Sequence, residues 1–355
     1  MTPLQRVLEG RIARSGPIGL AEYMTLCLLH PEHGYYTRSP PFGAEGDFVT
    51  APEISQMFGE MLGLFLARVW LDQGRPAPFV LAEPGPGRGT LMADMLRATR
   101  GVPGFHEAAG IWLVEASPRL AELQRRALSG HRVTHAENLS ALPEGPLYLV
   151  ANEFFDALPV RQFQRTERGW QERMVGLEGG RLALGLAPPL ATPPVETAEA
   201  AIGDIREIRP AATAIMEEIA PRIEAAGGVA LVIDYGSWGP AGNSLQAVRN
   251  HTRCDLLATP GRADLSAHVD FRALAAGAGG LARSALTPQG VFLERLGITA
   301  RARRLAEGLE GAALENHLAA HRRLTHPEEM GNLFQAIGFH PTGTPPLPGL
   351  SPDDP

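Results

Sequence analysis

Short apolar segments alternate with helical segments between residues 78 and 153, and this alternation restricts the possible folds more than any other feature of the chain. Nearly continuous apolar strands separated by helices are typical of a parallel sheet that is covered on both faces. The sequence therefore predicts an α/β fold with a doubly wound, mostly parallel sheet. The predicted strands are 78–85, 111–117, 131–137, 147–153 and 228–236, and the predicted helices between them include 90–99 and 118–128.

The segments that flank this core are predicted to be mainly helical. Thr50 and Glu53 match a capping box, and apolar residues then recur with helical spacing as far as Val69. We divide the chain into a helical N-terminal segment with a lid-like loop (1–72), a core (73–236) with a hairpin excursion (161–205), a substrate-side region (237–289), C-terminal helices with a last strand (290–345) and a disordered tail (346–355).

The composition excludes several classes of function. A formal net charge of −7 offers no basic field to attract nucleic acid, and no apolar run is long enough to cross a membrane. The sequence contains no lysine, which excludes a lysine nucleophile or base. Cys27 and Cys254 do not form a metal-finger pattern, and no secretory signal is visible. We expect a cytoplasmic protein without a bound metal.

A glycine-rich turn follows the first predicted strand. Gly85, Gly87 and Gly89 alternate with other residues, and Thr90 stands where the last glycine of a dinucleotide fingerprint would fall. Glu83 precedes the turn, and its carboxylate would repel a pyrophosphate but suit a positively charged ligand without phosphate. S-adenosylmethionine, with its sulfonium and α-ammonium groups, has this character. A tight strand-to-helix turn that binds nothing is the alternative.

Polar residues after the next strands complete a predicted nucleoside site. Glu115, at the end of the second strand, is placed to accept hydrogen bonds from ribose hydroxyls. Asn138 and Leu139 follow the third strand, where an adenine edge would lie, and Asn152 ends the fourth. Because ligands of open α/β sheets bind outside the carboxyl ends of the strands, we predict that these cofactor-binding candidates meet there.

Two carboxylates, Glu153 and Asp156, follow the fourth strand with Phe154 and Phe155 between them. Carboxylates flanked by aromatic rings suit a cationic acceptor such as a guanidinium group, which they hold through bidentate hydrogen bonds. They would also take up its proton during methylation. Glu153 and Asp156 are therefore catalytic candidates, and the two phenylalanines are substrate-side candidates. In the alternative, Asn152 and Asp156 cap a helix and the rings belong to the core.

Longer motifs connect these features to a known family. GDFVTAPEISQMFGE, GPGRGT, LVEASPRL, NEFFDALPV and LQAVRNHT occur in this order between residues 14 and 335, and through them the chain resembles the MidA-like methyltransferases. The eukaryotic members are the mitochondrial complex I assembly arginine methyltransferases. The resemblance implies a seven-stranded Rossmann-like methyltransferase sheet, S-adenosylmethionine as cofactor and a protein substrate such as a complex I subunit. It also implies substrate-side positions for Asp47, Thr50 and Glu53, while Pro84 departs from the family pattern.

Tyr235 and His251 are the remaining substrate-side candidates. Tyr235 follows the fifth strand at the same sheet edge, where it either lines an acceptor pocket or packs. His251 lies in a loop whose His and Asp spacing fits no zinc or two-metal template. Three rival interpretations stay open: a nicotinamide-dependent dehydrogenase, a non-catalytic assembly chaperone or scaffold, and a small-molecule methyltransferase. A homodimer is compatible with the sequence.

Overall fold

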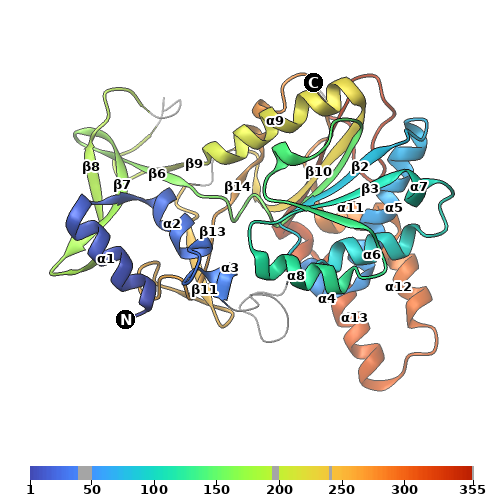
Figure 1. Cartoon of the computed structure of the whole chain (residues 1–355), viewed down its shortest axis with the longest axis horizontal. Helices are drawn as coiled ribbons and strands as arrows, with labels where there is room; N and C mark the ends of the chain where they lie inside the picture. The colour runs from blue at the N-terminus through green and yellow to red at the C-terminus, as the bar shows by residue number, and fades with distance from the viewer. Residues whose placement is uncertain (39–49, 194–199, 240–241, 354–355) are drawn as a thin grey trace.

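The computed structural model describes residues 1–38, 50–193, 200–239 and 242–353 (Figure 1). Its main feature is a nine-stranded sheet in which β10, β5, β2, β3 and β4 are paired in parallel, the short β14 also pairs in parallel with β10, and one long strand, β17, runs antiparallel to β10. This arrangement confirms the predicted mostly parallel methyltransferase-like sheet. Its path runs through β15 (Ala282–Arg283), β17 (Phe334–His340), β10 (Gly228–Ser237), β5 (Leu147–Asn152), β2 (Phe79–Pro84), β3 (Ala109–Val114) and β4 (Val133–Ala136), with β14 (Val269–Asp270) beside β10 and β16 (Thr287–Pro288) beside β17.

Helices cover both faces of this sheet (Figure 1). Successive residues of a strand point to opposite faces, so Phe79 and Leu81 of β2 pack into one core cluster and Val80 and Ala82 into the other. The first cluster includes residues of α5 (Gln56–Asp72), α6 (Thr90–Thr99), α11 (Gln289–Leu296) and α12 (Ile298–Ala306), and the second includes residues of α9 (Pro210–Ala226) and α10 (Phe271–Gly277).

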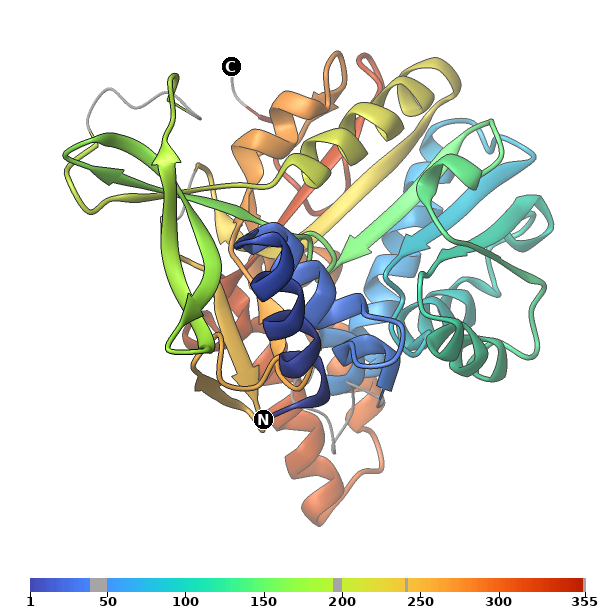
Figure 2. The same ribbon diagram turned by 60° about the vertical axis from the view of Figure 1, so that its left-hand side comes forward.

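A second lobe lies beside the central sheet (Figures 1 and 2). Its antiparallel sheet confirms the hairpin predicted around residues 167–169, because Thr166 pairs with Gly169. The sheet contains β1 (Ile18–Gly19), β6 (Arg161–Thr166), β7 (Gly169–Glu178), β8 (Arg181–Pro189) and β9 (Ile205–Ile208). Its core is shared with α1 (Pro3–Ser15), α2 (Leu20–Leu29) and a small sheet of β11 (Gln246–Arg249), β12 (Thr252–Cys254) and β13 (Asp264–Ser266).

Seven further helical elements complete the described part of the chain. They are α3 (Tyr35–Arg38), α4 (Ala51–Ile54), α7 (Phe105–Ala108), α8 (Pro118–Ala127), η1 (Leu139–Ala141), α13 (Gly311–Thr325) and η2 (Pro327–Gly331). Among the residues that the structure describes, no helix combines the length and the apolar character that crossing a membrane requires.

The predicted continuous helix from Thr50 to Val69 is wrong, because it is split at Ser55. Ser55 is extended (φ −161°), and its side chain accepts a hydrogen bond from Met57 N at the start of α5. Thr50 does occupy the N-cap of α4, but its side chain makes no capping hydrogen bond. Glu53 instead accepts a hydrogen bond from the Thr90 hydroxyl at 2.6 Å. A contact distant in sequence has thus replaced the local capping box.

The expectation of a disordered tail is wrong for residues 346–353. Leu347 and Leu350 are buried in the main core cluster. Arg283 Nε donates a hydrogen bond to the carboxylate of Asp353 at 2.6 Å. Burial of the two leucines removes apolar surface from water and so favours docking of this proline-rich segment on the core.

Candidate active site

Two pockets meet at the carboxyl edge of the parallel strands. The glycine-loop pocket has a volume of about 360 Å³, and the carboxylate pocket has a volume of about 430 Å³. Glu153 and Tyr36 line both, so the pockets adjoin at these two side chains. The lining of the glycine-loop pocket includes Gly85, Gly87, Glu115, Asn138, Leu139 and Phe154, and that of the carboxylate pocket includes Thr50, Asp156, Tyr235, His251, Asp264 and Arg323.

The glycine loop follows β2 in a conformation that requires glycine. Gly85, Gly87 and Gly89 have φ angles of 61°, 55° and 84°, in the left-handed region that residues with a Cβ rarely adopt. A Cβ at Gly85 would lie 2.9 Å from Cδ2 of Phe154, which lines the same pocket. Gly89 is the N-cap of α6 and is not among the residues that line the pocket. Pro84 does not disturb the strand end, since Gly85 N still donates to Val114 O at 3.0 Å.

Glu115 is connected to the glycine loop through Gln124. Its carboxylate accepts hydrogen bonds from Ser117 N at 2.7 Å and from Gln124 Nε2 at 3.0 Å. The same Gln124 nitrogen also donates to Gly87 O at 2.8 Å. Burial raises the pKa of Glu115. The second strand end and the glycine turn are therefore held as one wall of the pocket.

A small cleft of about 50 Å³ extends from the glycine loop and contains two buried acceptors without partners. Glu83 is 3% exposed, and no described residue bonds to its Oε2 atom; the same holds for Oδ1 of Asn152. Burial raises the pKa of Glu83 to about 8. Buried acceptors are normally satisfied, so this pair favours a ligand that brings a donor, and the carboxylate favours a cationic donor.

Glu153 stands between the two pockets in a constrained conformation. Its φ angle is 50°, which costs a residue with a side chain on the order of 1–2 kcal/mol and indicates that the surroundings impose the geometry. Its N–H donates to Ile233 O at 2.9 Å, and its Oε1 atom accepts from Ala51 N at 3.0 Å and Asn152 Nδ2 at 3.2 Å. Burial raises the pKa of Glu153 to about 7.

The carboxylate pocket gathers acidic groups with aromatic neighbours. Burial and the nearby Asp234 and Glu153 hold the pKa of Asp156 well above its usual range. Asp264 accepts a hydrogen bond from the Tyr36 hydroxyl at 2.9 Å, and the Tyr235 hydroxyl donates to Ser266 Oγ at 2.6 Å. Carboxyl groups of this kind can bind a planar cation, and Arg253 and Arg323 also line the pocket. Within the described ranges, no group of three or more His, Cys, Asp and Glu side chains is arranged to hold a metal ion.

Several substrate-side candidates do not lie where the sequence predicted. Phe155 is only 1% exposed and packs in the core cluster with α9, so its assignment to the substrate pocket is wrong. Phe154 lines the glycine-loop pocket and not the carboxylate pocket. Glu53 lines the small cleft beside Glu83. Asp47 lies outside the described residues. Adjacent residues in the turn after β5 face different directions, which a linear motif does not reveal.

Two residues of the site were missed by sequence reasoning. Tyr36 lines both pockets, and Gln124 joins Glu115 to the glycine loop. Asp264, which lines the carboxylate pocket, was expected only as one of the His and Asp residues that organise a loop or contact a protein substrate. Tyr36 lies within the HPEHGYY segment, whose density of Gly and aromatic residues was its only signal. Gln124 carries no signal, because a glutamine in a helix is ordinarily a solvent-exposed residue.

Comparisons with known proteins agree over almost the whole chain. Residues 61–288 match the family described as an S-adenosyl-L-methionine-dependent methyltransferase. The mitochondrial protein arginine methyltransferase NDUFAF7 is 38% identical in mouse, over 96% of this chain and 85% of the relative. The human protein of that name is 37% identical over 96% and 84%. A Burkholderia thailandensis crystal structure with bound S-adenosyl-homocysteine has a TM-score of 0.82 at 28% identity, covering 98% of this chain and 94% of that one.

Proposed function

Because the chain belongs to the S-adenosylmethionine-dependent methyltransferases, we propose that it methylates an arginine side chain of a protein. The observation that carries this proposal is the position of Glu153, whose carboxylate lines both the glycine-loop pocket and the acidic carboxylate pocket. The relatives named above as protein arginine methyltransferases support the same acceptor.

The glycine-loop pocket fits the cofactor. When bound, S-adenosylmethionine supplies a methyl group on a positively charged sulfonium. Because Gly85 and Gly87 have no side chains, the cofactor could approach the backbone of the glycine loop closely. Glu115 would accept hydrogen bonds from the ribose hydroxyls. Glu83 and Asn152, whose buried oxygens have no partner among the described residues, would accept hydrogen bonds from the α-ammonium group.

The carboxylate pocket would hold and deprotonate the acceptor. Glu153, Asp156 and Asp264 line this pocket and would hold the guanidinium so that one nitrogen faces the glycine-loop pocket. As that nitrogen forms its bond to the methyl carbon and the carbon–sulfur bond breaks, the guanidinium must lose one proton. The Glu153 carboxylate would take it, because burial raises its pKa to about 7 and so makes it a better base than an exposed glutamate.

The finer proposal is that the acceptor arginine belongs to a subunit of NADH–quinone oxidoreductase. It rests on the resemblance to the complex I assembly methyltransferases. Mass spectrometry of proteins from a deletion strain and its parent tests it, and we expect one arginine methylation on such a subunit to be lost. Loss of an arginine methylation on another protein would identify that protein as the target instead. An unchanged arginine methylation profile, with accumulation of an unmethylated metabolite, would replace the proposal with small-molecule methylation.

Cofactor binding is expected to release a proton near neutral pH. The carboxyl group of Glu83, with its pKa of about 8, is largely protonated at pH 7, and a neighbouring ammonium group stabilises the charged form. Affinity should therefore increase as the pH rises from about 6 to about 8. Calorimetry in two buffers of different ionisation enthalpy measures the released proton. Glu83→Gln should remove the Glu83 contribution, and an unchanged proton release in that variant would contradict the assignment.

A further inference from the structure

We propose that Asp234 and Arg209 are positioning residues for methyl transfer, which together hold the acceptor loop (residues 153–158) in the geometry that presents its carboxylates to the two pockets. The inference rests on the proposed acceptor role of Glu153 and Asp156. Neither positioning residue lines the glycine-loop pocket or the carboxylate pocket, so both act through the loop.

Asp234 accepts hydrogen bonds from backbone N–H groups of the acceptor loop. It lies near the end of β10 and is 0% exposed. Its Oδ2 atom accepts hydrogen bonds from Phe155 N at 2.9 Å and Asp156 N at 3.2 Å, and its Oδ1 atom accepts one from Tyr235 N at 2.9 Å. A buried carboxyl group that accepts three backbone N–H bonds is a rigid support, because hydrogen bonds are strong in a dry environment.

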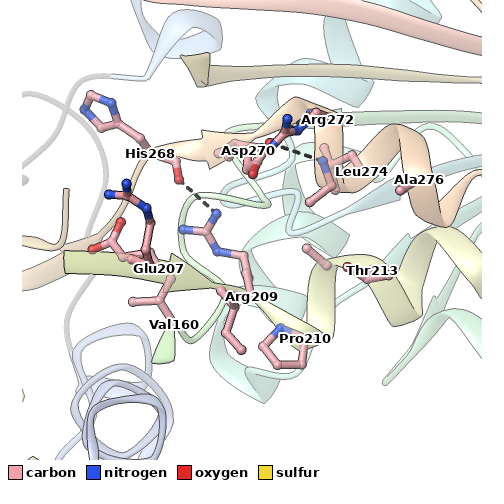
Figure 3. Close-up of a pocket in the computed structure, with 15 residues that line it drawn as sticks. Val160, Glu207, Arg209, Pro210, Thr213, His268, Asp270, Arg272, Leu274 and Ala276 are labelled. Atoms are coloured by element: carbon pink, nitrogen blue, oxygen red, sulfur yellow. Dashed lines mark hydrogen bonds between the residues drawn. The ribbon is translucent and has the colours of Figure 1, made fainter. Parts of the chain in front are cut away.

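Arg209 donates hydrogen bonds to backbone carbonyl groups of the same loop. It immediately precedes α9, and its guanidinium donates to four backbone carbonyls: Leu158 at 3.0 Å, His268 at 3.2 Å, Ala267 at 2.9 Å and Asp156 at 3.4 Å. Figure 3 shows the guanidinium of Arg209 directed at the carbonyl oxygen of His268. One side chain therefore joins the acceptor loop to the segment before β14.

The two side chains act on opposite sides of one residue. The N–H of Asp156 bonds to Asp234, and its carbonyl oxygen accepts hydrogen bonds from Arg209 and from Ala267 N at 3.0 Å. Upstream, the backbone of Glu153 is bonded to Ile233 of β10 in its left-handed conformation. The positive charge of Arg209 also offsets the repulsion between Asp234 and the acidic side chains of the site.

A cavity of about 410 Å³ beside Arg209 supplies matched controls (Figure 3). Arg272 also lines this cavity, but its side chain is exposed and its guanidinium is bonded to no part of the acceptor loop in the described structure. Asp270 accepts two backbone N–H bonds at the start of α10, as Asp234 does in the acceptor loop. Substitutions at these two positions repeat the chemistry of the test variants without touching the loop.

The test compares Asp234→Asn and Arg209→Lys with Asp270→Asn and Arg272→Lys. The assay follows tritium transfer from labelled S-adenosylmethionine to the protein fraction of the deletion strain. We expect the rate at saturating cofactor to fall about 100-fold in both test variants, while the calorimetric affinity for S-adenosyl-homocysteine changes less than about twofold. Lysine keeps the charge of Arg209 but lacks the planar fork that serves four carbonyls. Both controls should retain the parent rate.

Rates within about threefold of the parent in folded Asp234→Asn and Arg209→Lys would overturn the inference. A fall in rate that is matched by an equal loss of cofactor affinity would also overturn it, because it would indicate general damage to the fold. If Asp234→Asn does not fold, Arg209→Lys decides the question by the same readouts. Failure of the proposed function is distinguishable, since Glu153→Gln would then retain its activity whatever the two positioning variants do.

Discussion

Replacing Glu153 with glutamine is expected to lower the rate of methyl transfer about 1000-fold and to leave the cofactor bound. Glutamine keeps the shape of the side chain and an oxygen that can accept the bonds from Ala51 N and Asn152 Nδ2, so the fold and the glycine-loop pocket should persist. It removes the carboxylate that is proposed to take the acceptor proton. Tritium transfer at saturating S-adenosylmethionine measures the rate, and calorimetry with S-adenosyl-homocysteine measures the retained affinity.

The pH profile provides a second readout of the same variant. Burial raises the pKa of Glu153 to about 7, and a base must be deprotonated to act. The wild-type rate should therefore rise with pH through about 7 and be lost as the pH falls below it. The residual rate of Glu153→Gln should lack this ascending part. A rise of equal size at the same pH in the variant would assign the titration to another group, such as Asp156.

Glu122→Gln is the matched control for this variant. Glu122 lies on α8, is exposed, and pairs only with Arg125 and Arg126 of its own helix among the described residues. Exposed pairs of this kind contribute little, so its rate and its pH profile should match the wild type. Normal turnover by Glu153→Gln would remove Glu153 from the proposed mechanism and leave the family assignment intact.

The parts of the fold that were predictable depend on local rules. The helix at 90–99 and the strands at β2, β5 and β10 follow from apolar runs and from the glycine turn between β2 and α6. The same rules bring Glu83, Glu115 and Glu153 to one sheet edge, because parallel strands end on the same side. The glycine turn and these three glutamates, which lie at or beside the two pockets, could thus be predicted from the sequence.

The rest of the site depends on contacts between residues far apart in the chain. Tyr36 meets Asp264, and Gln124 meets Gly87, through the packing of elements that no periodicity connects. Ser55 splits a helix whose apolar pattern is continuous, and the neighbouring Glu53 bonds to Thr90 across the fold. Phe154 and Phe155 look equivalent in sequence, yet the first lines a pocket and the second is core. Tertiary packing overrides local preference at each of these positions.

Substituting valine at Gly85 is expected to weaken cofactor binding about 100-fold or more, or by about 3 kcal/mol, because its side chain would enter the glycine-loop pocket. The left-handed backbone would in addition cost the folded protein on the order of 1–2 kcal/mol of stability. The added Cβ would lie 2.9 Å from Cδ2 of Phe154, so the ring must move, and it lines the pocket proposed to bind the cofactor. The branched methyl groups would occupy part of the same space. Calorimetry with S-adenosyl-homocysteine measures the loss, and circular dichroism confirms that the variant is folded.

Gly130→Val separates this effect from a general intolerance of valine at glycine positions. Gly130 lies in the turn after α8, its φ angle is not in the left-handed region, and a Cβ there would meet no atom within 4 Å. The affinity of the Gly130→Val variant for S-adenosyl-homocysteine should equal that of the parent protein. Unchanged affinity in a folded Gly85→Val variant would show that the glycine loop is only a tight turn between β2 and α6. The cofactor would then have to bind elsewhere along the sheet edge, and the partnerless oxygens of Glu83 and Asn152 would need another ligand.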